Sequence, residues 1–444
     1  MANILWRDCQ IVGEDKILEG DVRACDGRFE CVGGDLSAKP GEQIIEAKGQ
    51  LLLPGLIDDQ VHFRQPGLTH KADIFTESRA AAAGGITSFM DMPNVKPPTL
   101  SMKRLEEKRA LAAADSLINY AFYLGVSHDN LVAVRTAEPR RIAGVKIFMG
   151  ASTGDMLVDD ENILRQVFKV APTLIATHCE SSPRIADNLQ KAQVQYDGNI
   201  PPAAHPLIRD AEACYQSSSL AIRLATETGA RLHILHISTA KELSLFAPGA
   251  PTDKQITAEA CVHHLLFDEA DYATLGMRLK TNPAVKTRAD REALRRAVAE
   301  GRIDVLATDH APHLLAEKDL PYQQAAAGLP QVEYALPALL ELVADGALTY
   351  PQIATRGAAA VADIFAVRDR GRIAEGYWAD CVLVKKTPAG VPVRDGVLSK
   401  CGWTPFVGRL FRHQIFATFV NGGAVWQDGK IQDNARGMAL EFAR

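Results

Sequence analysis

Five side chains that can bind a metal stand at the ends of separate apolar, strand-like runs of the sequence. They are His62, Lys146, His178, His236 and Asp309. Neutral imidazole and carboxylate are preferred ligands of zinc and similar divalent ions. Ligands on separate strands can converge only where strand ends meet, as they do at the C-terminal rim of a (β/α)8 barrel. A single buried histidine is more often a hydrogen-bonded core residue, so the prediction of a metal site depends on the whole set.

The first of these runs, L-I-D-D-Q-V-H-F-R, carries several polar side chains. Side chains alternate along a strand, so one face of this run carries Asp58, Gln60, His62 and Arg64. The same alternation predicts that Asp59 points outward. Four polar residues on one buried face need a reason, and a metal with its substrate supplies one.

Lys146 is the unusual member of the set. An ammonium group is repelled by a divalent cation, and a buried lysine is unfavourable unless its charge is removed. An amine that loses its proton in a dry site can add carbon dioxide, and the resulting carbamate is an anionic ligand able to bridge two metals. The alternative is a lysine that extends to the solvent at the rim. The residue alone leaves both readings open.

Eight strand-like segments alternate with helix-like segments, which predicts a (β/α)8 barrel. The strand-like segments begin at Leu56, Ile86, Leu117, Gly144, Ile175, Leu232, Ile256 and Val305. The clearest helix-like segments are 75–84, 102–114, 162–170, 211–229 and 288–300. One interval is long because it holds residues 197–209, whose prolines and glycine suit a loop over the rim.

Both ends of the chain read as short strands broken by turns. They predict a small β-sandwich built from residues 1–54 and 366–444, with the α/β barrel of residues 55–365 between them. The stretch 385–412 suits either a loop or an irregular strand.

Composition limits the function classes. The 444 residues carry a net charge of −5 without a basic block, so nucleic acid is not an expected partner. No apolar stretch approaches the roughly 18 to 20 residues that span a bilayer, and the start does not resemble a signal peptide. We therefore expect no membrane association and a cytoplasmic location. The eight cysteines form no C-x-x-C pair and are expected to be reduced thiols.

Several runs resemble those of the cyclic amidohydrolases, and most closely the long-chain bacterial dihydroorotases. They are D-x-x-V-H-F-R-Q-P-G, M-P-N-V-K-P-P, G-V-K-I-F-M-G, A-T-H-C-E and A-T-D-H-A-P-H. The similarity covers essentially the whole chain. It implies reversible, zinc-dependent cyclisation of N-carbamoyl-L-aspartate to dihydroorotate in pyrimidine synthesis. We also expect a homo-oligomer, with aspartate transcarbamoylase as a candidate partner.

The resemblance also implies a role for individual residues. One or two zinc ions would be bound by His62, carboxylated Lys146, His178, His236 and Asp309. Asp309 would also move the proton during catalysis. The substrate would be held by Arg64, Asn94 and His313 at its carboxylate, and by Asn282 and the backbone near Gly328 at its ring. His264 is placed in the pocket by family pattern, with a core role as the alternative.

The chain departs from the family at one ligand position. The usual first-strand signature is H-x-H, and Gln60 takes the place of the first histidine. An amide oxygen is a poor zinc ligand beside imidazole, so one of two metal positions is expected to be weak. A second departure lies beside Asn282, where the run N-P-A-V-K replaces the more usual N-P-P-L-R.

Two other functions compete. A catalytically inactive scaffold for aspartate transcarbamoylase should lose several metal ligands, whereas this chain keeps five and loses one. An allantoinase or hydantoinase opens a ring without the same carboxylate, and Arg64 in H-F-R-Q-P-G argues against that substrate class.

Overall fold

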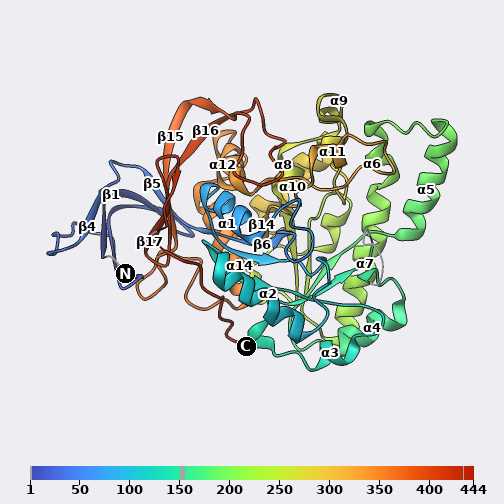
Figure 1. The fold of residues 1–444 in the computed structure, drawn as a ribbon, viewed down its shortest axis with the longest axis horizontal. Coiled ribbons are helices and arrows are strands. Elements are labelled where there is room, and N and C mark those ends of the chain that lie inside the picture. The colour runs from blue at the N-terminus through green and yellow to red at the C-terminus, as the bar shows by residue number, and fades with distance from the viewer. Residues whose placement is uncertain (1–2, 151–155, 434) are drawn as a thin grey trace.

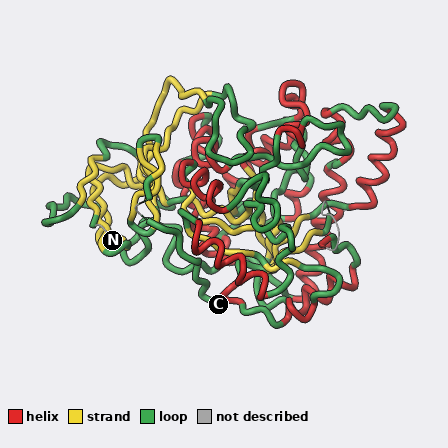
Figure 2. Tube along the Cα trace, in the orientation of Figure 1, coloured by secondary structure: helices red, strands yellow, loops and turns green. Residues whose placement is uncertain are grey.

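The computed structural model describes residues 3–150, 156–433 and 435–444. A ring of parallel strands is surrounded by helices, and a sheet made from both ends of the chain lies to one side of it (Figures 1 and 2). Among the described residues, no helix has the length and apolar character needed to cross a membrane.

The central strands pair in parallel from β6 round to β14, with β9 continuing β8 after Tyr123. The ring closes where β14 meets β6, because the His62 N–H donates to the His310 carbonyl at 2.8 Å. This confirms the predicted (β/α)8 barrel. The strands are β6 (Leu56–Val61), β7 (Ile86–Asp91), β8 (Asn119–Phe122), β9 (Leu124–Gly125), β10 (Val145–Phe148), β11 (Ile175–His178), β12 (Leu232–Ile234), β13 (Ile256–Cys261) and β14 (Val305–Ala307).

Helices surround the barrel, and the five predicted helical segments correspond to α1, α2, α4, α7 and α10. Local signals set their ends: the Asp73 carboxylate caps α1, and Gly229 ends α7 with φ 75°, which glycine adopts without strain. The helices are α1 (Ile74–Ala83), α2 (Met102–Asp115), α3 (Leu131–Arg135), α4 (Glu161–Val170), α5 (Ser182–Gln195), α6 (His205–Ile208), α7 (Ala211–Thr228), α8 (Val262–Leu266), α9 (Tyr272–Leu275), α10 (Arg288–Glu300), α11 (Leu315–Lys318), α12 (Ala335–Ala344), α13 (Tyr350–Ala354) and α14 (Ala360–Phe365).

The chain ends join where β5 pairs antiparallel with β15. The first half of β1 pairs with β4 and its second half with β5, which bends the sheet around a core containing Trp6 and Phe419. This arrangement agrees with the predicted β-sandwich. Its strands are β1 (Ile4–Val12), β2 (Ile17–Cys25), β3 (Arg28–Val32), β4 (Gln43–Glu46), β5 (Leu51–Pro54), β15 (Cys381–Pro392), β16 (Leu410–Val420), β17 (Gly423–Gln427) and β18 (Lys430–Ile431).

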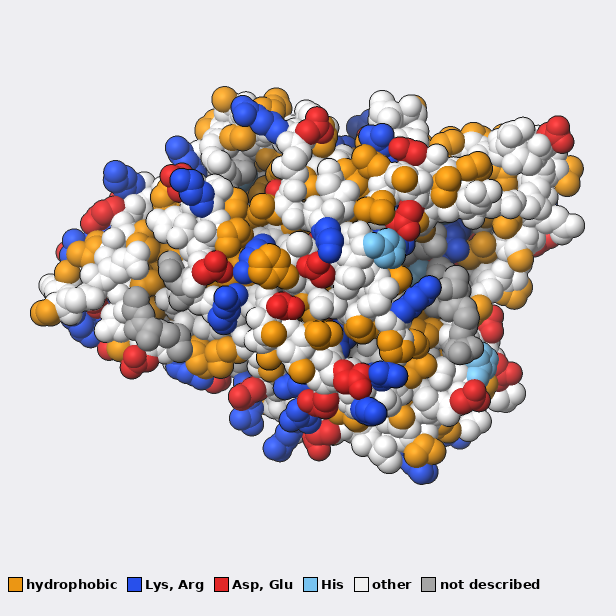
Figure 3. All heavy atoms as spheres, viewed as in Figure 1, with side chains coloured by type: hydrophobic (Ala, Val, Ile, Leu, Met, Phe, Trp, Pro, Cys, Tyr) orange, Lys and Arg blue, Asp and Glu red, His pale blue; other side chains and the backbone are white. Residues whose placement is uncertain are grey.

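The C-terminal residues leave this sheet and run along the barrel, where the Tyr120 N–H donates to the Met438 carbonyl at 3.0 Å. The exact domain boundaries at residues 54/55 and 365/366 stay a prediction. The stretch 385–412 contains the end of β15, a connection, and the start of β16. Figure 3 shows acidic and basic side chains interspersed over one face of the molecule.

Helix α14 closes the end of the barrel where the strands begin. Its Val361 and Phe365 share an apolar cluster with residues near the strand starts, including Ile57 and Leu174. The apolar packing of α14 therefore closes the end of the barrel where the strands begin. Polar side chains gather at the opposite end, where the strands finish.

Candidate active site

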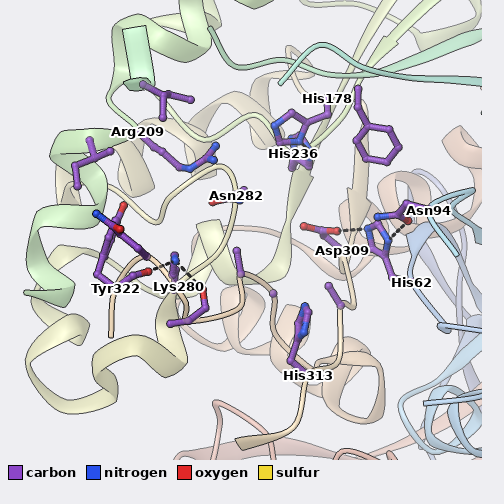
Figure 4. A pocket seen from close by; sticks show the side chains of 18 of the residues that line it. His62, Asn94, His178, Arg209, His236, Lys280, Asn282, Asp309, His313 and Tyr322 are labelled. Carbon is purple, nitrogen blue, oxygen red and sulfur yellow. Dashed lines mark hydrogen bonds and ion pairs between the residues drawn. The ribbon is translucent and has the colours of Figure 1, made fainter. Parts of the chain in front are cut away.

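A cavity of about 630 Å³ opens at the C-terminal ends of the barrel strands (Figure 4). Ten of the predicted site residues line it: Gln60, His62, Arg64, Asn94, His178, His236, Asn282, Asp309, His313 and Gly328. Lys146 and His264 are buried but do not line the cavity. The structure therefore brings together most of the residues that the sequence singled out, from strands far apart in the chain.

Strand ends aim these side chains into the cavity. His236 and Asp309 follow β12 and β14 by two residues, and Arg64 follows β6 by three. All three have left-handed backbones, with φ 41°, 48° and 67° respectively. Non-glycine residues adopt this conformation at an energetic penalty, and such residues cluster at functional sites.

His178 and His236 form one half of the candidate metal site. Their Nδ1 and Nε2 atoms are 2.9 Å apart. His178 donates from Nε2 to the Glu180 carboxylate at 2.8 Å, so its Nδ1 keeps a lone pair. Burial lowers the pKa of both histidines, which keeps the imidazoles neutral. Two neutral ring nitrogens facing each other at this distance fit a shared divalent cation.

Gln60, His62 and Asp309 form the other half. His62 donates from Nδ1 to the Asn94 carbonyl oxygen at 2.8 Å, which turns its Nε2 lone pair toward Asp309 Oδ1 at 3.1 Å. A lone pair facing a carboxylate oxygen fits a cation between them. Gln60 donates its amide N–H to the same oxygen at 3.1 Å. Its Oε1, the atom able to bind a metal, is buried without a hydrogen-bond partner among the described residues.

Lys146 lies on β10 with only 1% of its surface exposed. Its Nζ has no hydrogen-bond partner among the described residues and lies 4.6 Å from the centre of the Phe148 ring. Burial lowers the pKa of Lys146 to about 7. The solvent-exposed alternative is therefore wrong, and an amine of this kind fits the chemistry of carbamate formation.

Arg64 and His313 form the side of the cavity predicted to bind a carboxylate. Arg64 donates from Nε to the Pro312 carbonyl at 3.1 Å and from Nη2 to His313 Nε2 at 3.0 Å. Burial lowers the pKa of Arg64 to about 10, so its charge is kept at neutral pH. Its Nη1 donates to no atom among the described residues.

The remaining predicted residues differ in whether they line the cavity. Asn282 lines the cavity, and its Oδ1 is buried without a partner among the described residues. Gly328 shapes the wall, since a Cβ there would lie 2.5 Å from the Ala311 carbonyl oxygen. His264 contacts the Pro283 carbonyl at 3.2 Å, so it supports the Asn282 loop from below rather than lining the pocket.

The sequence predicted a loop over the rim at residues 197–209, but it singled out no side chain on the far wall of the cavity. Arg209, Lys280 and Tyr322 lie there, opposite His62 and Asp309 (Figure 4). Lys280 donates to the Tyr322 carbonyl at 2.5 Å, and Arg209 pairs with Glu180. Helix α5 also contributes to this wall. The Ser-Pro pair at its start is a sequence signal from which the helix could have been predicted.

One prediction about the first strand is wrong. Asp59 was expected to point outward, but its carboxylate lies inside the barrel, 3.2 Å from His233 on β12. The pairing of β6 with β7 shifts register between Asp58 and Val61, and this irregularity breaks the alternation of side chains.

The fold and the polar side chains at the rim together agree with one class of protein. The sequence pattern of the amidohydrolase family matches residues 51–425, and the chain belongs to this family. It is 37% identical to a dihydroorotase from Halobacterium salinarum, over 93% of this chain and 94% of that relative. It is 32% identical to a dihydroorotase from Methanothermobacter thermautotrophicus, over 99% and 98% of the two chains. An allantoinase from Bacillus velezensis is 29% identical, over 99% and 97%.

Solved structures support the fold. An L-hydantoinase from Arthrobacter aurescens superposes with a TM-score of 0.92 at 24% identity, over 99% of this chain and 100% of that one. The predicted resemblance to the cyclic amidohydrolases is therefore confirmed at the level of the family and the fold.

Proposed function

We propose that this chain is a dihydroorotase, which interconverts dihydroorotate and N-carbamoyl-L-aspartate. The observation that carries the proposal is the charged guanidinium of Arg64, held inside the cavity beside the metal-ligand set. The relatives named dihydroorotase at 37% and 32% identity support it. Rings handled by hydantoinases and allantoinases lack the same carboxylate, so they have less need of this group.

The substrate carboxylate would bind to Arg64. Two of its nitrogens are held by Pro312 and His313, which fixes the plane of the guanidinium. Its Nη1 then offers a charge-assisted hydrogen bond into the cavity. The side-chain carbonyl oxygen of Asn94 accepts the hydrogen bond from His62. The amide N–H groups of Asn94 are therefore available to bind the substrate carboxylate.

The ligand set fits divalent cations in both halves. Such cations, with zinc as the expected metal and a carbamate on Lys146 as a further ligand, would supply an activated water and polarise the ring amide carbonyl. During hydrolysis water adds to this carbonyl and the ring C–N bond breaks. Asp309 takes the proton of the attacking water at its carboxylate and delivers it to the leaving ring nitrogen. The reverse sequence closes the ring.

A substrate comparison tests the proposal. Dihydroorotate, allantoin and hydantoin should be assayed side by side with metal-loaded protein, and dihydroorotate should have the highest kcat/KM. A preference for allantoin or hydantoin would contradict the assignment. Absence of turnover for all three, in protein that holds its metal, would favour the scaffold function.

Arg64→Gln sharpens this test, with Gln323→Ala as a control on the opposite wall. Loss of a charge-assisted contact at Arg64 should lower kcat/KM for dihydroorotate by about 10- to 100-fold. Gln323 lines the cavity beside Tyr322 and carries no charge, so its change should have a smaller effect. A larger loss for Gln323→Ala than for Arg64→Gln would show that the substrate carboxylate does not bind to Arg64.

A further inference from the structure

Three ionisable side chains meet inside the barrel, below the cavity. Asp59 on β6, His233 on β12 and Glu259 on β13 are all fully buried. His233 Nε2 lies 3.2 Å from Asp59 Oδ2 and 3.8 Å from Glu259 Oε2. The ligand atoms of the three residues lie within 4.8 Å of one another. The group lies between helix α14 and the cavity. The His233 ring packs against Phe365 of α14, with ring centroids 5.5 Å apart, and Glu259 accepts the backbone N–H of His236.

Neighbouring groups orient two of these side chains. His233 donates from Nδ1 to the Thr257 hydroxyl at 2.8 Å, since that hydroxyl donates its own proton to the Leu232 carbonyl. This leaves His233 Nε2 facing the two carboxylates. Glu259 Oε1 accepts the His236 N–H at 2.9 Å, which leaves Oε2 facing His233. Metal-binding histidines and carboxylates are usually held in this way by an outer partner.

Within the part of the chain that the structure describes, both Asp59 oxygens, Glu259 Oε2 and His233 Nε2 are buried without a hydrogen-bond partner. Two buried carboxylates are strongly unfavourable unless a cation compensates them. Ligand atoms around a tetrahedral zinc lie about 3 to 4 Å apart, given bonds of about 2.0 to 2.2 Å, and the two contacts to His233 fall in that range.

We propose that Asp59, His233 and Glu259 form a cation site for a divalent transition metal such as zinc, separate from the two halves of the candidate active site. One imidazole and two carboxylates are a ligand set that zinc and manganese accept. Because Glu259 also holds the His236 backbone, a cation here stabilises the position of that residue. The proposal does not depend on which ring the enzyme opens.

The alternative to a metal ion at this site is a proton on His233. Burial lowers the pKa of His233, but Asp59 and Glu259 raise it to about 9, so an imidazolium would also compensate the carboxylates. Crystals of zinc-loaded full-length protein, measured above and below the zinc edge, separate the two. We expect an anomalous peak about 2.0 to 2.2 Å from His233 Nε2 and the facing carboxylate oxygens. A peak in the cavity with none at this position would overturn the proposal.

Metal counting gives a second test without substrate. Zinc-loaded, dialysed protein should lose about one equivalent of zinc in Asp59→Asn relative to wild type. Asp304→Asn is the control, because Asp304 is equally buried and pairs with Lys254 instead. Circular dichroism and the melting temperature establish that each variant is folded. Folded Asp59→Asn that retains the wild-type zinc content would contradict the proposal, and if neither variant folds the anomalous maps decide.

Discussion

The two halves of the candidate active site differ in what holds their ligands. In the first half two imidazoles converge, and the charged Glu180 fixes the orientation of His178. In the second half a neutral amide orients His62, and Gln60 offers an amide where the resemblance predicts an imidazole. Imidazoles held by a carboxylate bind zinc better than an amide does. The comparison therefore predicts two cations of unequal affinity.

Lys146→Ala should have the largest effect, because a carbamate at this position would serve both halves. We expect kcat/KM to fall by more than about 100-fold. This loss exceeds the one expected when a residue that only orients a metal ligand is changed. Short carboxylic acids should restore part of the activity by entering the space left by the side chain, and short amines should not. Electron density that ends at a bare amine in metal-loaded protein would contradict the carbamate.

Glu180→Gln should weaken the stronger half. Burial raises the pKa of Glu180, but Arg209 and His178 lower it to about 2, so the carboxylate is charged at neutral pH. Removing this charge should lower metal affinity or activity by about 10- to 100-fold. Glu212→Gln is a surface control on the neighbouring helix α7. Equal zinc affinity in wild type and Glu180→Gln would show that the carboxylate does not support His178.

Gln60→His should have the smallest effect. It should strengthen zinc binding rather than weaken it, since it adds an imidazole to the weaker half. We expect zinc affinity of that half to rise while the other half stays unchanged. Anomalous diffraction at successive zinc concentrations measures the occupancy of each half separately, and also separately from the buried site of Asp59, His233 and Glu259. Unchanged affinities and an unchanged rate would show that the Gln60 substitution is silent.

The sequence was sufficient for the barrel and for most of the rim. Strand-like runs alternate regularly with capped helices, and polar residues at strand ends such as His178 and Asp309 must meet in a closed barrel. The terminal sheet was also predictable, because its short strands and turns repeat at both ends of the chain.

Features that depend on strand register or on contacts between distant segments could not be predicted. Asp59 points inward because β6 shifts register against β7, and no alternation pattern contains that information. Tyr322 and Arg209 share a wall only because α5 and α6 extend over the rim, which requires knowledge of how these helices pack. His264 lies below the Asn282 loop for the same kind of reason.

Zinc titration of the metal-free wild-type protein, with occupancy located by anomalous diffraction at each step, tests the difference between the two halves most directly. We predict that His178 and His236 acquire zinc first and that the Gln60, His62 and Asp309 half fills only at higher concentration. Simultaneous filling of both halves with equal affinity would contradict the account.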